Sequence, residues 1–226
     1  MAYKKHWTQT AKSTITQTKH LLSNLSIKVR TDQFNLFNKI LKPIASDKIL
    51  DVGVSSSELL KDSNMFEKLY PYPKNLTLAT IENPKDLKKL YPKTRVKKII
   101  PQKPLPFKNN QFDIVVSWAT LEHVGGHKDQ FFFLQELNRV GKKVFLTTPY
   151  RACPYEPHSG IWFLHWLPLK MFRKFCKLTD KNFWVDEKNL NPLYIRDIKK
   201  MSLGNDTKIK IYKIFGIIPS HLLIYT

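Results

Sequence analysis

Two histidines, His123 and His158, offer the clearest chemistry in this sequence. A histidine titrates near neutral pH, so each is suited to accept a proton from a hydroxyl or amine nucleophile. His123 is the first candidate for this catalytic role and His158 is the second. For both, the alternative is a residue that only shapes a pocket or packs in the interior. Glu122 can orient His123 only if the backbone brings their side chains together, because neighbours in a helix point apart.

His123 follows a predicted strand. Residues 112–116 form a short apolar run rich in β-branched residues, with a polar turn before it and Ser117 and Trp118 after it. In an open α/β sheet the ligand lies outside the carboxyl ends of the strands. We therefore expect Ser117, Trp118, Glu122 and His123 to lie where a ligand is met.

Strands and helices alternate from residue 48 to residue 148, which predicts a parallel sheet with right-handed crossovers and an α/β fold. Two later strands, at 208–215 and 221–225, suit an antiparallel hairpin. The other predicted strands are 48–53, 76–81, 96–100, 112–116 and 143–148, and the predicted helices of this region are 31–44, 58–69, 84–91 and 128–140.

Two of these segments resemble motifs of a known family. Residues 105–125 contain Leu-Pro-Phe, Phe-Asp and Leu-Glu-His in this order and resemble motif IV of class I S-adenosylmethionine-dependent methyltransferases, in their methyltransferase type 11-like branch. Residues 48–53, Lys-Ile-Leu-Asp-Val-Gly, resemble motif I. The resemblance spans about residues 31–226.

The resemblance implies a Rossmann-like class I methyltransferase fold, with a seven-stranded, mostly parallel sheet closed by the C-terminal antiparallel hairpin. It implies S-adenosylmethionine as the cofactor. The implied reaction is O- or N-methylation of a small-molecule or saccharide-type acceptor. Two alternatives stay open: a catalytically inactive binding domain on this fold, and a nucleic-acid methyltransferase or binder.

The resemblance also implies cofactor-binding residues at the first strand. Gly53 lets the backbone approach the cofactor, and Asp51 orients the turn and the methionine part of the cofactor. Ser55 stands in a run of three serines where the family usually has further glycines. This departure is the reason that an inactive binding domain stays open.

Four more cofactor-binding residues are implied at the ends of later strands. Glu82 accepts both ribose hydroxyls, unless it only caps the helix that begins at Pro84. Gln102 stands where the family has an acidic residue that holds the adenine amino group. Ser117 and Trp118 complete the set.

Residues 149–180 are predicted to form a lid that selects the substrate, because a long, proline-rich and aromatic insertion lies at the carboxyl edge of the sheet. The segment resembles the His-then-His-Trp-Leu-Pro pattern of some members of this branch. That pattern favours His158 and His165 facing the active site, and structural packing of both is the alternative. The predicted substrate-binding residues are Glu122, Tyr150, Arg151, His165 and Trp166.

Within the lid, residues 169–178 predict a basic amphipathic helix beside the apolar residues 161–167. Such a pattern is typical of a protein that rests on an anionic membrane surface. Core packing of the same residues is the alternative.

Length and composition narrow the class of protein. The 226 residues suit one domain, 31–226, after an N-terminal arm, 1–30. A cytoplasmic location is expected, because no apolar run is long enough for a bilayer and the N-terminus lacks the apolar core of a signal peptide.

The net charge of +20 invites a nucleic-acid partner. The composition argues against such a partner, because only six of the 38 basic residues are arginine and the lysines are scattered through the chain. Cys153 and Cys176 are expected to be free thiols, and no metal site is predicted. The sequence does not indicate an oligomeric state.

Overall fold

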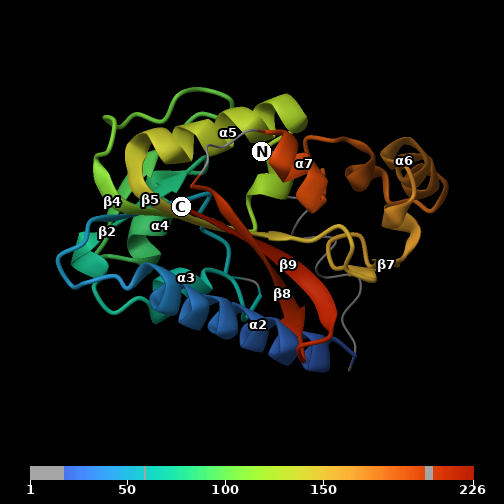
Figure 1. The fold of residues 1–226 in the computed structure, drawn as a ribbon, viewed down its shortest axis with the longest axis horizontal. Helices are drawn as coiled ribbons and strands as arrows, with labels where there is room; N and C mark the ends of the chain where they lie inside the picture. Colours follow the sequence, from blue (N-terminus) through green and yellow to red (C-terminus); the bar gives the residue numbers. More distant parts are fainter. Residues whose placement is uncertain (1–17, 59, 202–205) are drawn as a thin grey trace.

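A seven-stranded sheet with the strand order β3-β2-β1-β4-β5-β9-β8 lies at the centre of the protein (Figure 1). The computed structural model describes residues 18–58, 60–201 and 206–226. The strands are β1 (Ile49–Val52), β2 (Leu76–Thr80), β3 (Arg95–Lys98), β4 (Phe112–Trp118), β5 (Gly141–Pro149), β6 (Tyr155–Glu156), β7 (Ile161–Trp162), β8 (Lys208–Ile214) and β9 (Ile218–Tyr225). The helices are α2 (Thr18–Leu41), α3 (Met65–Leu69), α4 (Pro84–Leu90), α5 (His127–Val140), α6 (Leu169–Leu178) and α7 (Ile195–Lys200), with short 3₁₀ helices η1 (Pro73–Asn75), η2 (Leu121–His123), η3 (Leu164–Trp166) and η4 (Asn182–Val185).

Neighbouring strands of this sheet are parallel except around β9, which runs antiparallel to both β5 and β8. Strands β1 and β2 are buried at every position. A parallel sheet is covered by helices on both faces, so its inner strands are nearly continuous apolar runs. The predicted α/β fold, with a mostly parallel seven-stranded sheet and a C-terminal antiparallel hairpin, is confirmed.

Helices cover both faces of the sheet (Figure 1). On one face α2, α3 and α4 pack on a core that includes Phe37 and Phe66, whose ring centroids lie 5.2 Å apart. On the other face α5 and α7 pack through residues such as Leu134 and Ile198. The sheet therefore holds the ends of its strands in fixed positions between two apolar layers.

Helix α2 corrects the predicted boundary of the N-terminal arm. It runs without a break from Thr18 to Leu41, whereas the sequence predicted an arm up to residue 30 and a helix at 31–44. The helix extends further because Val29, which lies before the predicted start, is buried against the fold. Helices in proteins gain most of their stability from such packing. The part of the arm before Thr18 lies outside the described residues.

The helix predicted at 58–69 is also shorter than expected, because only Met65–Leu69 is helical. The preceding loop bonds to other parts of the chain. The Asn64 side-chain amide donates to the Ser55 carbonyl over 2.9 Å, and Asn64 itself has a left-handed φ of 51°. Such a residue interrupts a right-handed helix, so α3 can begin only after it.

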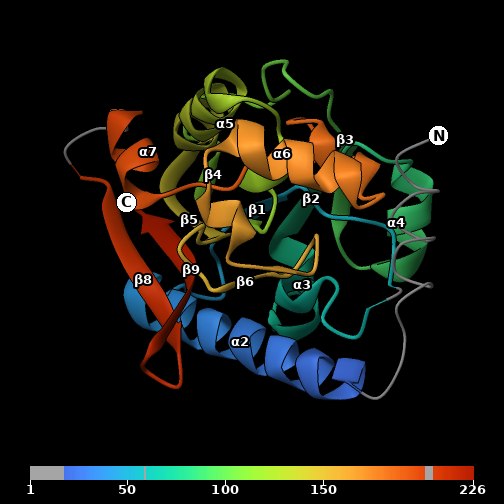
Figure 2. The same cartoon turned by 90° about the vertical axis from the view of Figure 1, so that its right-hand side faces the viewer.

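The lid and the segment that follows it form a small unit of their own across the carboxyl edge of the sheet (Figure 2). The hairpin of β6 and β7, helix α6 and η4 share a cluster that includes Ile161, Phe172, Cys176 and Trp184. Both Cys176 and Cys153 are free thiols. Among the described residues, no helix is long and apolar enough to cross a membrane.

Candidate active site

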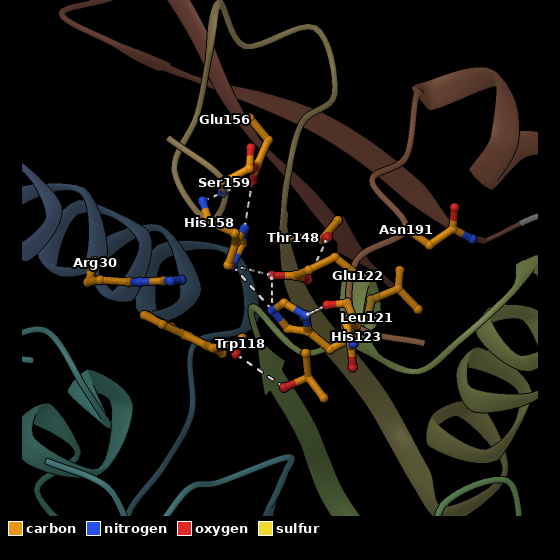
Figure 3. A network of polar contacts seen from close by, with 12 residues as sticks. Arg30, Trp118, Leu121, Glu122, His123, Thr148, Glu156, His158, Ser159 and Asn191 are labelled. Atoms are coloured by element: carbon orange, nitrogen blue, oxygen red, sulfur yellow. Dashed lines mark hydrogen bonds and ion pairs between the residues drawn. The ribbon is translucent and has the colours of Figure 1, made fainter. Parts of the chain in front are cut away.

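A polar cluster of Glu122, His123 and His158 lies where β4 ends against the lid (Figure 3). Residue Ala119, with a φ of 49°, turns the chain at the end of β4, and the η2 helix follows. Glu122 is completely buried. One of its carboxylate oxygens, Oε2, accepts a hydrogen bond of 2.9 Å from the Thr148 hydroxyl on β5.

The two histidines of the cluster face each other at right angles, with an interplanar angle of 85° and Nε2 atoms 3.2 Å apart. The other ring nitrogen of each histidine, Nδ1, donates a hydrogen bond to an oxygen atom that can only act as an acceptor. His123 Nδ1 donates to the Asn189 carbonyl over 2.6 Å, and His158 Nδ1 donates to the Glu156 carboxylate over 2.8 Å. Both rings are thus held with Nε2 directed into the cluster.

The surroundings separate the pKa values of the two histidines. Burial lowers the pKa of His123, and the negative charge of Glu122 offsets this only in part. Burial also acts to lower the pKa of His158, but the Glu156 carboxylate outweighs it and the pKa is raised. For Glu156 itself, burial is outweighed by His158 and Ser159, which bring the pKa of the carboxyl to about 2. The cluster therefore pairs a neutral histidine with one that favours the proton.

Arg30 reaches toward the cluster from α2 (Figure 3). Burial lowers the pKa of its guanidinium, while Asp62 and Glu122 act in the opposite direction. The sequence analysis missed Arg30, because a single basic residue in a segment of weak periodicity has no distinguishing pattern. It also missed Thr148, Glu156 and Asn189. Of these, only Glu156 had a usable signal, a carboxylate two residues before His158.

At the carboxyl ends of β1 and β2, the serine-rich loop is tied to Glu82. The Ser56 N–H donates to the Glu82 carboxylate over 2.8 Å, the Ser55 hydroxyl donates over 3.1 Å, and the Ser56 hydroxyl makes a third contact. Gly53 starts the loop with a φ of 102°, and an added Cβ would lie 2.3 Å from the Thr120 hydroxyl. Thr120 immediately precedes η2, so the glycine turn touches the segment that carries Glu122 and His123.

These contacts fit a cofactor with vicinal hydroxyls. A carboxylate offers about four lone-pair positions, and in this structure serine hydroxyls occupy positions on Glu82 that ribose hydroxyls would take. The residues that would hold S-adenosylmethionine are therefore the glycine turn at Gly53 and the carboxylate of Glu82.

Asp51, which the resemblance places at the cofactor, has a buried carboxyl partner. It is buried, and its carboxyl shares a hydrogen bond with the carboxyl of Glu67 on α3. Burial and the charge of Glu67 raise the pKa of Asp51 well above its usual range, and burial raises the pKa of Glu67 to about 7. The Asp51 carboxyl thus contacts the Glu67 carboxyl on α3 in the interior of the protein.

The other three predicted cofactor residues, Ser117, Trp118 and Gln102, lie in three different environments. Ser117 is completely buried, and its hydroxyl donates to the Val52 carbonyl over 2.7 Å, so this side chain connects β4 to β1. Trp118 packs on Phe66, with ring centroids 5.5 Å apart, and its buried Nε1 makes no hydrogen bond within the described structure. Gln102 lies exposed in the turn after β3, with a left-handed φ of 57°.

The predicted substrate residues of the lid divide into two groups. Tyr150, Arg151 and His165 line a cavity of about 10 Å³ beside Glu122. Trp166 is exposed.

Arg151 connects two parts of the lid. Its guanidinium donates hydrogen bonds to the carbonyls of His165 and Leu167 over 2.9 and 2.6 Å. The Nε2 of the buried His165 donates to the Cys153 carbonyl over 2.7 Å. These bonds connect the first part of the lid, residues 151–153, to residues 165–167 within the lid itself.

Comparison with known proteins agrees with the fold. The family model of the methyltransferase domain matches residues 50–144. The solved structures that resemble the chain include the YcgJ protein from Bacillus subtilis, at 13% identity and a TM-score of 0.55 over 86% of this chain and 97% of that one.

Two further structures are S-adenosylmethionine-dependent methyltransferases. The one from Mesorhizobium loti has 11% identity and a TM-score of 0.52, with 82% of this chain and 98% of that one covered. The one from Aquifex aeolicus has 12% identity and a TM-score of 0.51, with 86% and 88% covered. The comparison with curated proteins gave no match.

The comparisons thus give a methyltransferase domain over residues 50–144. The fold around it is the one found in solved structures of S-adenosylmethionine-dependent methyltransferases.

Proposed function

We propose that the protein methylates a hydroxyl or amine of a small-molecule or saccharide-type acceptor, and that the acceptor reacts at the cluster of Glu122, His123 and His158. The observation that carries this proposal is the contact between the two halves of the site. Thr120, which packs on the glycine turn at Gly53, lies two residues before Glu122. The cofactor side and the proton-accepting side are therefore adjacent.

When bound, S-adenosylmethionine supplies an activated methyl group, whose bond to sulfur breaks as a bond to the acceptor oxygen or nitrogen forms. Glu82 and the glycine turn bind and orient that cofactor. The acceptor must lose one proton during the transfer, and the cluster is suited to take it. Both catalytic candidates from the sequence, His123 and His158, lie in this cluster with their Nε2 atoms directed inward.

A small cavity of about 10 Å³ lies between Glu122 and the lid, which is about the space of one water molecule. His123 and His158 do not line this cavity. The proposed acceptor class therefore rests on the proton-accepting groups of the cluster and not on the size of the cavity.

The experiment has two parts. Isothermal titration calorimetry with S-adenosylhomocysteine on the full chain should show binding to one site. Transfer of a labelled methyl group from S-adenosylmethionine should then be measured on a panel of hydroxylated aromatics, amines and saccharides. RNA is included as the acceptor that the alternative function would use. Methylation of RNA alone would contradict the proposed acceptor class, and absence of S-adenosylhomocysteine binding would contradict the proposed activity.

A further inference from the structure

We propose that Glu122, His123 and His158 form a binding site for a divalent transition-metal ion. Each residue offers one ligand atom, and the three atoms lie within 4.8 Å of one another. The sequence predicted no metal site, because residues that are 35 positions apart show no ligand spacing. Two imidazoles and one carboxylate are ligands that zinc, iron, cobalt and manganese accept in proteins.

The hydrogen bonds around the histidines are those of metal ligands. A histidine that binds a metal through one ring nitrogen almost always donates its other N–H to a carbonyl or a carboxylate. His123 donates from Nδ1 to the Asn189 carbonyl, and His158 donates from Nδ1 to the Glu156 carboxylate. When the ring is neutral, each contact places the lone pair on Nε2, and both Nε2 atoms are directed to the same point (Figure 3). A bound metal ion would take the place of the proton that the two Nε2 atoms share over 3.2 Å.

The third ligand atom, Glu122 Oε1, is an independent indication of a bound cation. Glu122 is completely buried, and within the described structure its Oε1 accepts no hydrogen bond, while Oε2 is held by Thr148. A buried carboxylate oxygen without a hydrogen-bond donor is costly. Oε1 lies 3.7 Å from Nε2 of His123 and 3.8 Å from Nε2 of His158.

The separations of the ligand atoms agree with a metal ion between them. Metal–ligand bonds of about 2.1 Å place two ligands roughly 3.0 to 3.5 Å apart in octahedral or tetrahedral sites. The two Nε2 atoms are 3.2 Å apart, and the carboxylate oxygen is a few tenths of an ångström further from each of them than that range. Small rotations of the Glu122 side chain close this difference.

The local charge also favours a divalent cation. Around the two histidines lie the carboxylates of Glu122 and Glu156 and the guanidinium of Arg30. Their sum is one negative charge when all three are ionised. A divalent ion makes the sum one positive charge, and an acceptor that has lost its proton would neutralise it.

With three protein ligands the ion keeps open positions, as catalytic metal sites do. For the reaction this extension rests on the proposed function. An acceptor hydroxyl bound to the ion loses its proton more easily, because a metal ion lowers the pKa of a bound oxygen. Glu122, His123 and His158 would then serve as ligands, and the proton would leave to solvent.

The test uses the full chain, stripped of metal with a chelator and titrated with Zn²⁺ by calorimetry. The cobalt form is examined by visible absorption for the bands of a site with nitrogen and oxygen ligands. We expect one ion bound by the cluster per chain. The variants His123→Ala and His158→Ala should each lower the affinity by about 100-fold or more. His127→Ala, which removes an exposed histidine at the start of α5, is the matched control and should bind as the original protein does.

Equal Zn²⁺ affinity in the original protein and in both cluster variants would overturn the proposal and leave a shared proton as the link between the histidines. The cobalt spectrum of the unsubstituted protein keeps the test valid if a variant fails to fold, because a spectrum without ligand-field bands also overturns it. Binding of S-adenosylhomocysteine is measured in parallel. Metal binding without cofactor binding would contradict the proposed function but not the metal site. Cofactor binding without metal binding would contradict the metal site but not the proposed function.

A second and independent observation concerns the outer surface of the lid. Trp162, Phe163 and Trp166 are exposed and in contact, with ring centroids 5.9 and 5.1 Å apart along the series. Met171 and Leu178 on α6 are also exposed. These side chains are more apolar than an ordinary surface and indicate an interaction site.

We propose that this apolar surface docks on an anionic membrane. The exposed side of α6 also carries Lys170, Lys174 and Lys177 among its apolar residues. Its inner side packs through Phe172 and Cys176 in the lid core, so core packing does not account for the exposed side. Aromatic residues beside lysines suit the boundary between lipid headgroups and acyl chains, and the lysines complement anionic lipids.

The test is co-sedimentation with vesicles of phosphatidylcholine, with and without phosphatidylserine, at low and at physiological salt. We expect binding to the anionic vesicles that weakens with salt, and a loss of about tenfold or more in Trp162→Ala/Phe163→Ala, since each large side chain contributes a few kcal/mol when buried. Phe215→Ala, which changes an exposed aromatic in the turn between β8 and β9, is the control. No binding at low salt, or equal loss in the control, would overturn the proposal.

Discussion

The Nε2 atoms of His123 and His158 lie 3.2 Å apart and join the end of β4 to the lid. One ring belongs to the scaffold of the sheet and the other to the segment that covers it. The pair therefore connects the lid to the sheet, at the place where we propose that the acceptor loses its proton.

Replacement of either histidine by alanine should reduce kcat by roughly 10² to 10⁴-fold, which is the usual contribution of a group that handles a proton or its metal equivalent. The affinity for S-adenosylhomocysteine should not change, because Glu82 and Gly53 lie on the cofactor side. Single-turnover methyl transfer and calorimetry give the two values. His127→Ala is the control, and an equal loss of activity in it would argue against a specific role of the pair.

Ser56→Ala should tighten the binding of S-adenosylhomocysteine, whereas Glu82→Gln should weaken it by about tenfold or more. The Ser56 hydroxyl contacts the Glu82 carboxylate, so its removal frees an acceptor that a ribose hydroxyl can use. A hydrogen bond to a charged group is worth about 1.5 to 3 kcal/mol. Calorimetry measures both variants, with the neighbouring Ser57→Ala as control. Weaker binding in Ser56→Ala would mean that this hydroxyl contacts the cofactor itself.

Stability should depend on pH through the buried carboxyls of Asp51 and Glu67. The pKa of Glu67 is raised to about 7 from an ordinary value of 4.5. The folded state therefore holds its proton more tightly than the unfolded state does. This contribution to the free energy of unfolding is complete below about pH 4.5 and is lost as the pH rises through about 7.

Glu67→Gln removes this titration, so the free energy of unfolding should decline less between pH 5 and pH 8 than in the original protein, by about 1 to 3 kcal/mol. Urea unfolding at several pH values measures the difference. Glu187→Gln, a change at an exposed carboxyl, serves as the control. A variant whose curve stays parallel to that of the original protein would show that the buried pair does not titrate in this range.

Arg151→Met should loosen the lid. Its guanidinium donates to the carbonyls of His165 and Leu167, and Met cannot replace either bond. We expect a loss of about 1 to 3 kcal/mol in the free energy of unfolding and a rise in KM for the acceptor. Arg151→Lys keeps the charge but lacks the planar guanidinium that donates to both carbonyls, so the free energy of unfolding should fall by an intermediate amount. If Arg151→Met kept both stability and KM, the closed lid would not depend on these bonds.

Most strands of the central sheet could be predicted from the sequence, because the pattern of apolar residues in a strand is a local property. The runs that became β1, β2 and β4 are mostly apolar, since both faces of an inner parallel strand are buried. The predicted starts of helices α2 and α3 were wrong, because these starts depend on contacts with distant residues. Val29 is buried by the rest of the fold, and the loop before α3 is bonded to Glu82 and Asn64.

The site divides in the same way. Residue types alone indicated that Glu122 and His123 follow a buried strand, and that His158 lies in an insertion at the same edge. They did not reveal that Ser117 bonds to Val52, that Asp51 bonds to Glu67, or that Arg30 reaches the cluster, because each of these depends on partners from another element.

The sequence by itself determined the order of strands and helices and the chemical groups available at the strand ends, because hydrophobic periodicity and turn residues act over a few neighbours. Only the tertiary structure decided which of those groups meet. Whether a histidine becomes a base, a metal ligand or a packed side chain depends on the acceptor that fixes its second ring nitrogen. For His123 that acceptor is the carbonyl of Asn189, 66 residues away in the chain.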